Sequence, residues 1–335
     1  MGRVGARARG VGVAVVVASA VLGCLSERLD TLPLPPTSPG SAPTASPTAS
    51  AATQPSVGAN EIVVGGSRPT VVDLPPATAD EPVPLLVMLH GYGSTGADHE
   101  TYFRFAAAAV TRGFAYAHPD GTVDRDGQRF WNATDACCDF DSTGIDDAAY
   151  LADLVAEISR TRAIDRQRVY FVGHSNGGFM SYRMACQHAD IVAAIVSLAG
   201  ATFAKRADCA PSQPVAVLEI HGTADDVVEF RGGRLSDFGA PGDKPAYPGV
   251  NATVASWEAY DGCDATVTRS ATTLDLDVGI GGTSGPAETT VDTWTDCAPG
   301  GHVELWTIRG GHHSPDLTPG FADTVLDFLL AHPKP

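Results

Sequence analysis

The chain has 335 residues, with 22 Lys or Arg against 39 Asp or Glu, which gives a formal net charge of -17. This acidity, and the lack of a basic cluster after the first ten residues, argue against nucleic acid as a partner, because phosphate neutralisation requires clustered Lys and Arg. The same charge repels polyanionic substrates at long range and favours neutral ones.

Residues 1–23 have the features of a secretory signal peptide: a basic start, an apolar run over 11–22 and small residues at the end. Residues 21–24 (Val-Leu-Gly-Cys) are similar to the lipobox of bacterial lipoproteins, in which the cysteine, here Cys24, is lipidated. Cleavage after residues 18–20 (Ala-Ser-Ala) is the alternative. In both cases we expect an extracellular or cell-surface protein. Lipidation of Cys24, in the first case, would anchor it to the outer face of the membrane.

Residues 24–58 form the next segment, which is rich in Pro, Ser, Thr and Ala and has no periodic apolar pattern. Such a composition cannot bury a core, so we expect an extended tether or a disordered tail without function. The folded domain is expected over residues 59–335.

The domain opens with two short strand patterns at 61–64 and 70–74, which predict a hairpin. Residues 84–89 are continuously apolar, as in a buried strand, and lead into residues 90–93 (His-Gly-Tyr-Gly). The two glycines either let the backbone at Tyr92 approach a ligand or serve only as turn residues.

A helix is predicted over 103–110, a strand over 114–119 and a further helix over 146–160. The loop between the last two, residues 120–144, is long enough to suggest a functional role. Its aromatic residues either wall a substrate cleft or pack within the loop itself: Phe130, Trp131 and Phe140.

The most informative segment follows the strand predicted at 169–172. Residues 173–177 read Gly-His-Ser-Asn-Gly and lead into a helical pattern. A strand, Gly-x-Ser-x-Gly and a helix together predict a nucleophile elbow, in which Ser175 is exposed on a tight turn. The amides of Asn176 and Tyr92 would then form the oxyanion hole. The alternative is an ordinary Gly-Ser loop between a strand and a helix.

Two more buried strands are predicted at 191–198 and 214–222. A carboxylate just after the second strand is where this kind of fold orients a catalytic histidine, so Asp225 is our choice and Asp226 the alternative. Both aspartates acting only as turn caps is the competing interpretation.

The last strand is predicted at 302–308, and a closing helix at 320–330. Two histidines, His312 and His313, follow this strand after a glycine pair. Only these histidines lie after the acid in a loop that leaves a terminal strand, which makes them the candidates for the base.

The order of these elements predicts an α/β protein with an α/β-hydrolase fold: a mostly parallel central sheet flanked by helices in a single catalytic domain. Over residues 61–330 the chain resembles the extracellular polyhydroxybutyrate depolymerase and feruloyl esterase group of that superfamily, including lipoproteins of the LpqC type. The resemblance rests on four segments, residues 89–93, 173–178, 221–225 and 310–312.

The resemblance implies Ser175 as nucleophile, Asp225 as orienting acid and His312 as base. The family's closing motif is similar to Gly-Gly-His-x-Trp-Pro, and here residues 310–315 read Gly-Gly-His-His-Ser-Pro. The match at Pro315 favours His312 over His313, while Ser314 replaces the tryptophan.

Apart from Cys24 the chain has six cysteines, an even number that favours disulfides over metal in an exported domain. Local separation and the family resemblance suggest Cys186 with Cys209 and Cys263 with Cys297. The adjacent Cys137 and Cys138 then either bond to each other or pair elsewhere. We expect neither a metal nor a cofactor.

The predicted activity is two-step hydrolysis of a carboxylic ester by a monomer. The resemblance suggests hydroxyalkanoate oligomers, polyester or feruloyl-type esters, including acylated saccharides, as substrates. Two alternatives stay open: a serine peptidase of the same fold, and a surface-tethered binding protein without activity.

Overall fold

The computed structural model describes residues 60–76, 80–238, 244–264, 266–281 and 287–335. The signal peptide, the tether and Cys24 lie outside these residues. Within the described ranges, none of the helices is both long enough and apolar enough to cross a membrane.

A ten-stranded sheet forms the centre of the domain, in the order β1-β2-β4-β3-β7-β8-β9-β14-β13-β12. The six inner strands, from β4 to β14, are parallel to one another. These strands are β3 (Val83–Leu89), β4 (Ala115–Ala117), β7 (Ile164–His174), β8 (Ala194–Leu198), β9 (Ala216–Gly222) and β14 (His302–Ile308). Because parallel strands end at the same edge, the segments that follow β3, β7, β9 and β14 come together there.

Antiparallel strands extend the sheet on both sides. The predicted hairpin is confirmed as β1 (Glu61–Val64) and β2 (Thr70–Asp73), with Val64 opposite Thr70. At the other edge lie β13 (Thr289–Trp294) and β12 (Val267–Arg269), which the sequence analysis did not predict. Two short hairpins lie outside the main sheet: β5 (Thr122–Val123) with β6 (Arg129–Phe130), and β10 (Gly232–Gly233) with β11 (Tyr247–Pro248).

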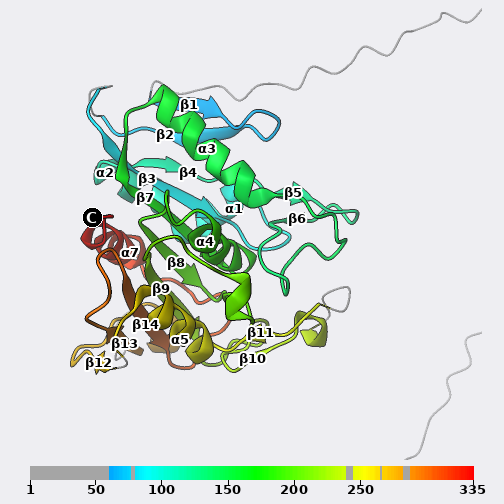
Figure 1. Ribbon diagram of the computed structural model, residues 1–335, viewed down its shortest axis with the longest axis vertical. Helices are drawn as coiled ribbons and strands as arrows, with labels where there is room; N and C mark the ends of the chain where they lie inside the picture. Colours follow the sequence, from blue (N-terminus) through cyan, green and yellow to red (C-terminus); the bar gives the residue numbers. More distant parts are fainter. Residues whose placement is uncertain (1–59, 77–79, 239–243, 265, 282–286) are drawn as a thin grey trace, which may run out of the picture. The chain divides into compact units, whose positions relative to one another are not determined.

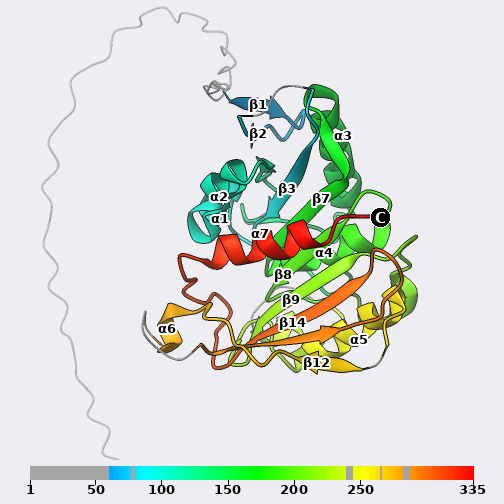
Figure 2. The ribbon, with the colours of Figure 1, turned by 90° about the vertical axis from the view of Figure 1, so that its left-hand side faces the viewer.

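Helices cover both faces of the sheet (Figures 1 and 2). Successive side chains of a strand point to opposite faces, so Leu85 and Val87 of β3 enter one core while Leu86 and Met88 enter the other. The first core is closed by α3 (Asp147–Thr161), α4 (Asn176–Gln187) and α5 (Val250–Asp261). The second is closed by α1 (Gly96–Phe103), α2 (Phe105–Thr111) and α7 (Phe321–Ala331). This two-sided burial explains the continuous apolar runs in β3, in the second half of β7 and in most of β8.

The helices differ from prediction in two places. The single helix expected over 103–110 is the pair α1 and α2, which meet at Arg104 in the left-handed conformation, with φ 60°. The helix α5 was not predicted, although Val250, Val254 and Trp257 repeat at helical spacing and are buried. Short helical segments complete the described chain at Arg206–Asp208, Leu235–Phe238 and α6 (Val278–Gly281).

Three disulfides connect the six cysteines of the domain. The predicted pairs Cys186–Cys209 and Cys263–Cys297 are confirmed. Cys137 and Cys138 are bonded to each other and do not pair with more distant cysteines. The first pair ties the end of α4 to the loop after β8, with Cα atoms 5.1 Å apart.

Candidate active site

The serine expected to be the nucleophile lies where β7 meets α4. Ser175 has φ 55° and ψ -120°, a backbone conformation that is strained for any residue with a side chain. Gly173 and Gly177 are required here, because a Cβ on Gly173 would collide with the backbone of Gly177, and one on Gly177 with that of Leu89. Ser175 N donates to Leu198 O at 2.8 Å, so the turn is anchored to the neighbouring strand. The strand, strained serine and helix fit the predicted elbow.

Asp225 lies in the turn that follows β9 and is buried, whereas Asp226 beside it is exposed. The Oδ1 atom of Asp225 accepts hydrogen bonds from the amides of Val227 and Val228, both at 2.9 Å. Burial raises the pKa of Asp225, but its hydrogen bonds with His221 and His313 outweigh burial and hold that pKa well below its usual range. Asp225 is therefore a fixed carboxylate.

The histidine paired with Asp225 is His313, so the expectation that His312 occupies this position is wrong. His313 Nδ1 lies 2.9 Å from Asp225 Oδ2 and 3.1 Å from Oδ1. His312 is exposed. The amide of Ala224 donates to Gly311 O at 2.9 Å, which fixes how the loop passes Asp225. Side chains of adjacent residues point in different directions, so this course of the loop places His313 against the Asp225 carboxylate and His312 in solvent.

The loop that carries His313 is also attached to the end of β7. His174 Nε2 lies 2.8 Å from His313 O, and the two rings have centroids 4.9 Å apart. Ser314, which replaces the family's tryptophan, lies with its Oγ 3.5 Å from the same nitrogen. These contacts attach the loop that carries His313 to His174, the residue that directly precedes Ser175.

The second loop at this edge follows β3 and contains Tyr92. Gly91 N donates to His99 Nε2 at 3.1 Å, and Gly93 N donates to Arg129 O at 2.8 Å. The hydroxyl of the tyrosine donates to Asp124, in the long loop after β4. Gly93 has φ 76°, which favours glycine at this turn. The bonds on both sides of Tyr92 fix the course of the backbone, and with it the direction of the Tyr92 amide.

His99 connects this loop to the end of β7. Its Nε2 lies 3.0 Å from His174 Nδ1, and Ser94 Oγ lies 2.9 Å from its Nδ1. Burial lowers the pKa of His99 to about 4 and lowers the pKa of His174 well below the usual value. Both imidazoles are therefore neutral at pH 7, and together they join the loops after β3, β7 and β14.

The side chain of Asn176 has a structural role that the sequence analysis did not anticipate. Its amide is at the start of α4, where helix geometry leaves backbone N–H groups without intrahelical partners. Its buried side chain accepts from Trp131 N at 2.7 Å and donates to Trp131 O at 2.9 Å. Asn176 therefore attaches the long loop after β4 to the first residue of the helix.

That loop does not expose its aromatic residues as a cleft wall. Trp131 and Phe130 are buried in the protein, at 0% and 1% exposure, and Trp131 Nε1 donates to His90 O at 3.1 Å. Phe140 packs with its ring edge against Tyr92, with centroids 5.2 Å apart. The alternative of packing within the loop itself is only partly right, because Trp131 and Phe140 also contact His90 and Tyr92, which lie outside the loop.

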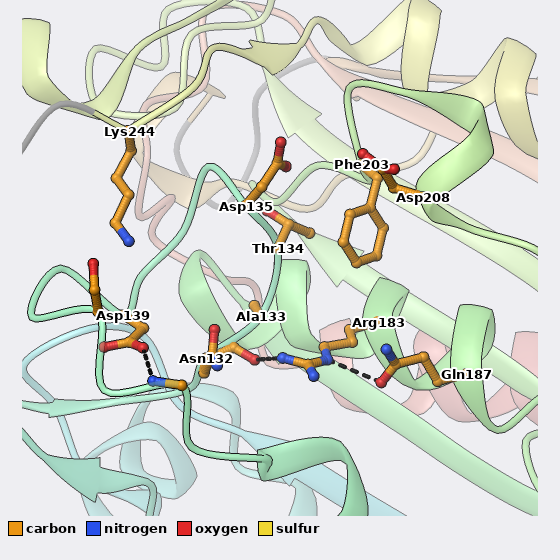
Figure 3. Close-up of a pocket in the computed structure, with 12 residues that line it drawn as sticks. Asn132, Ala133, Thr134, Asp135, Asp139, Arg183, Gln187, Phe203, Asp208 and Lys244 are labelled. Atoms are coloured by element: carbon orange, nitrogen blue, oxygen red, sulfur yellow. Dashed lines mark hydrogen bonds between the residues drawn. The ribbon is translucent and has the colours of Figure 1, made fainter.

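A pocket of about 380 Å³ is lined by residues of this loop and of α4, together with residues from other segments (Figure 3). Its wall combines carboxylates, amides, two cations and one aromatic ring. The residues that line it are Asn132, Ala133, Thr134, Asp135, Asp139, Ser142, Gly144, Arg183, Gln187, Phe203, Asp208 and Lys244. Arg183 is fixed by bonds to Asn132 O and to Gln187 Oε1. Arg183 lies two turns beyond Ser175, which at the rise of an α-helix corresponds to about 12 Å.

Known proteins resemble this chain over most of its length. The family model described as esterase PHB depolymerase matches residues 70–274. The putative esterase NocK of Nocardia uniformis subsp. tsuyamanensis is 28% identical over 351 residues, which cover 97% of this chain and 98% of that protein. Feruloyl esterase B of Piromyces equi is 29% identical over 255 residues, covering 74% of this chain and 42% of that protein.

Among solved structures, the acetyl xylan esterase from Aspergillus awamori superposes with a TM-score of 0.54 at 14% sequence identity. The superposition covers 80% of this chain and 97% of that one. At this identity the likeness concerns the fold alone, and it agrees with the predicted α/β-hydrolase architecture.

Proposed function

Because the chain belongs to the esterase PHB depolymerase family, and is thus a carboxylic ester hydrolase, we propose that it works through a catalytic triad of Ser175, His313 and Asp225. The observation that carries this proposal is the pairing of Asp225 with His313 beside the strained turn at Ser175. A strained serine, a histidine and a buried carboxylate are the groups that acyl transfer requires.

In the proposed first step, His313 accepts the proton of the Ser175 hydroxyl as the oxygen attacks the ester carbonyl. Asp225 holds the imidazole by its Nδ1 proton and stabilises the imidazolium that forms. The proton then passes to the leaving alcohol, and an acyl-enzyme is left on Ser175. Water repeats the sequence and releases the acid.

The amides of Tyr92 and Asn176 are proposed to bind the oxyanion of both tetrahedral intermediates. The start of α4 supports this role for Asn176, because a helix N-terminus carries partial positive charge. The fixed course of the Gly91–Gly93 backbone supports it for Tyr92. Loss of one such donor costs about 100- to 1000-fold in kcat.

The triad proposal is tested by Ser175→Ala, with Ser256→Ala on the surface of α5 as the matched control. We expect Ser175→Ala to abolish labelling by a fluorophosphonate probe and to lower kcat for p-nitrophenyl acetate by several orders of magnitude. The control should keep both at the wild-type level. Labelling of Ser175→Ala at the wild-type rate would refute the assignment.

For the substrate, we propose an acylated saccharide rather than a polyester oligomer. The polar pocket beside α4 supports this, because mixed hydrogen-bond donors and acceptors with one aromatic ring suit a polyhydroxylated alcohol. Arg183, one of the lining residues, lies about 12 Å along α4 from the serine, a spacing that suits sugar units beyond the one that carries the ester. The name of the Piromyces equi relative, a feruloyl esterase, supports a feruloyl acyl group rather than a hydroxyalkanoate one.

A substrate panel tests this proposal: a feruloylated xylo-oligosaccharide, methyl ferulate and a hydroxybutyrate trimer. We expect the highest kcat/KM for the oligosaccharide. Lys244→Ala should raise KM for that substrate and leave methyl ferulate unaffected, while Lys205→Ala, an exposed lysine outside the pocket, should change neither. A higher kcat/KM for the hydroxybutyrate trimer would contradict the proposal that the substrate is an acylated saccharide.

For the location, we propose that residues 1–23 direct export and that Cys24 is then lipidated, with residues 24–58 as a tether. Fractionation of cells that express the full chain tests this. Wild-type protein should sediment with membranes, and Cys24→Ser should be recovered in the soluble exported fraction. Equal membrane association of both proteins would contradict the anchor.

A further inference from the structure

Asp225 also contacts a group of buried polar side chains that the proposed mechanism does not use. His221 and Glu219 both belong to β9, two residues apart, and so point to the same face of the sheet. Their exposed fractions are 1% and 0%. Tyr182 of α4 is buried against them, and its hydroxyl donates to Glu219 Oε2 at 2.8 Å.

The contacts of His221 determine how many protons its ring carries. Its Nδ1 lies 2.7 Å from Glu219 Oε1. Its Nε2 lies 2.7 Å from Val228 O and 3.3 Å from Asp225 Oδ2. All three partners accept hydrogen bonds, whereas a neutral imidazole has only one N–H to donate. Both ring nitrogens are satisfied together only if His221 is an imidazolium, or if a neighbouring carboxyl group carries the proton.

Neither carboxyl group offers a favourable place for that proton. Asp225 accepts from two backbone amides and from His313, so its oxygens are occupied as acceptors. Glu219 accepts at Oε2 from Tyr182 and faces His221 with Oε1. A proton on Glu219 Oε1 would leave the same single net negative charge among the three buried groups as a cation on His221. Imidazole is the stronger base of the two, so the proton is assigned to His221.

We propose that His221 is a positioning residue: Glu219 holds it as a cation, and it fixes the Asp225 carboxylate and sets the proton affinity of His313. This inference rests on the proposed triad. Burial lowers the pKa of His221, but its hydrogen bonds with Asp225 and Glu219 prevail and raise that pKa to about 10, which agrees with the geometry. Burial raises the pKa of Glu219, and the bond from His221 opposes that effect.

The direction of the effect on His313 follows from the charges around it. The titratable groups that face this network are Glu219 on β9, Asp225 in the turn after β9, Tyr182 from α4, His313 in the loop after β14 and His174 at the end of β7. The positive charge on His221 weakens the hold of Asp225 on a proton at His313. Loss of that charge strengthens the hold, so His313 would stay protonated, and inactive as a base, up to a higher pH.

The direct test is the protonation state of His221 in the unaltered protein. The ¹⁵N chemical shifts of the imidazole, assigned by triple-resonance NMR, are measured between pH 6 and pH 9. We expect both ring nitrogens of His221 to be protonated throughout this range. A single protonated nitrogen at pH 7 would overturn the proposal. Since the spectrum is recorded without substrate, its outcome is independent of the labelling of Ser175, and the two proposals fail separately.

A variant tests the consequence for catalysis. Glu219→Gln keeps the size of the side chain and removes the charge that holds the His221 cation. We expect the acid limb of the pH profile of kcat/KM to move upward by about 0.5 to 1.5 pH units. The kcat should fall by about 10- to 100-fold, with KM nearly unchanged.

The matched control is Glu304→Gln, which removes the carboxylate from another Glu–His pair, 2.9 Å from His302 on β14, away from Asp225. This control should leave the acid limb where it is in the wild type. An unshifted acid limb in a folded, probe-reactive Glu219→Gln protein would overturn the proposal. If that variant does not fold, the NMR measurement on the wild type decides alone.

Discussion

Asn176 allows a quantitative prediction, because its side chain joins the helix of the nucleophile to the long loop. Asn176→Ala removes the acceptor of the Trp131 amide and one donor to Trp131 O, both in a fully buried position. The carbonyl keeps a bond from Cys138 N at 3.3 Å, so only the Trp131 N–H is left without its partner.

The expected cost is the sum of these two losses. A buried, unpaired N–H costs about 1–3 kcal/mol, and the second hydrogen bond contributes about 1 kcal/mol. The variant should therefore be less stable by about 2–4 kcal/mol, or roughly 4–10 °C in Tm for a domain of this size. Because the first residue of α4 loses its anchor, kcat should also fall by about 10- to 100-fold.

Thermal unfolding and kinetics with p-nitrophenyl acetate check both numbers. Asn251→Ala, which makes the same chemical change at an exposed position of α5, is the matched control and should leave Tm and kcat nearly unchanged. A Tm for Asn176→Ala equal to that of the control, together with wild-type kcat, would show that the contact with Trp131 stabilises neither the loop nor the site.

Two further predictions concern stability. Burial raises the pKa of Asp261 to about 7, so the contribution of this group to stability is present below the usual aspartate pKa and is lost as pH rises through 7. The Tm of Asp261→Asn minus that of wild type should therefore increase from pH 5 to pH 8. A constant difference would refute this. Removing the Cys186–Cys209 disulfide, which closes a loop between residues 23 apart, should cost about 3 kcal/mol in denaturant unfolding when both cysteines are replaced by serine. An unchanged midpoint would indicate that the loop after β8 is held by other contacts.

The parts of the fold that the sequence predicted well are those with a strong local signal. The inner strand β3 is continuously apolar and buried, and β14 alternates buried apolar residues with more polar ones; the bounds of both strands differ from prediction by at most one residue. The edge strands β12 and β13 are partly exposed and mixed in character, so their pairing depends on neighbours that a local pattern does not reveal.

The site shows the same division between local and long-range information. Ser175 is fixed by a five-residue motif with a steric cause, and Asp225 by its place after a strand. The choice between His312 and His313 depends on the path of a loop, which is set by the bond from Ala224 N to Gly311 O across two chain segments. A match to the family's closing motif that is displaced by one residue therefore selects His312 in place of His313.

His221 and the side chain of Asn176 lie within motifs that the sequence analysis had already singled out. Both were missed because their partners, Glu219 and Trp131, become relevant only through burial and hydrogen bonding in the folded protein. The signal that was available is a polar pair at alternate positions of an otherwise apolar strand, Glu219 and His221 in β9.

The most direct test of the account compares His313→Ala with His312→Ala in the same esterase assay, with fluorophosphonate labelling as a second measurement. We expect His313→Ala to lose about 1000-fold or more in kcat and to react with the probe only slowly. His312→Ala should keep kcat within about twofold of the wild type, because its side chain is exposed and Asp225 is bonded to its neighbour. The opposite result, in which His312→Ala is inactive and His313→Ala is not, would contradict the proposed triad.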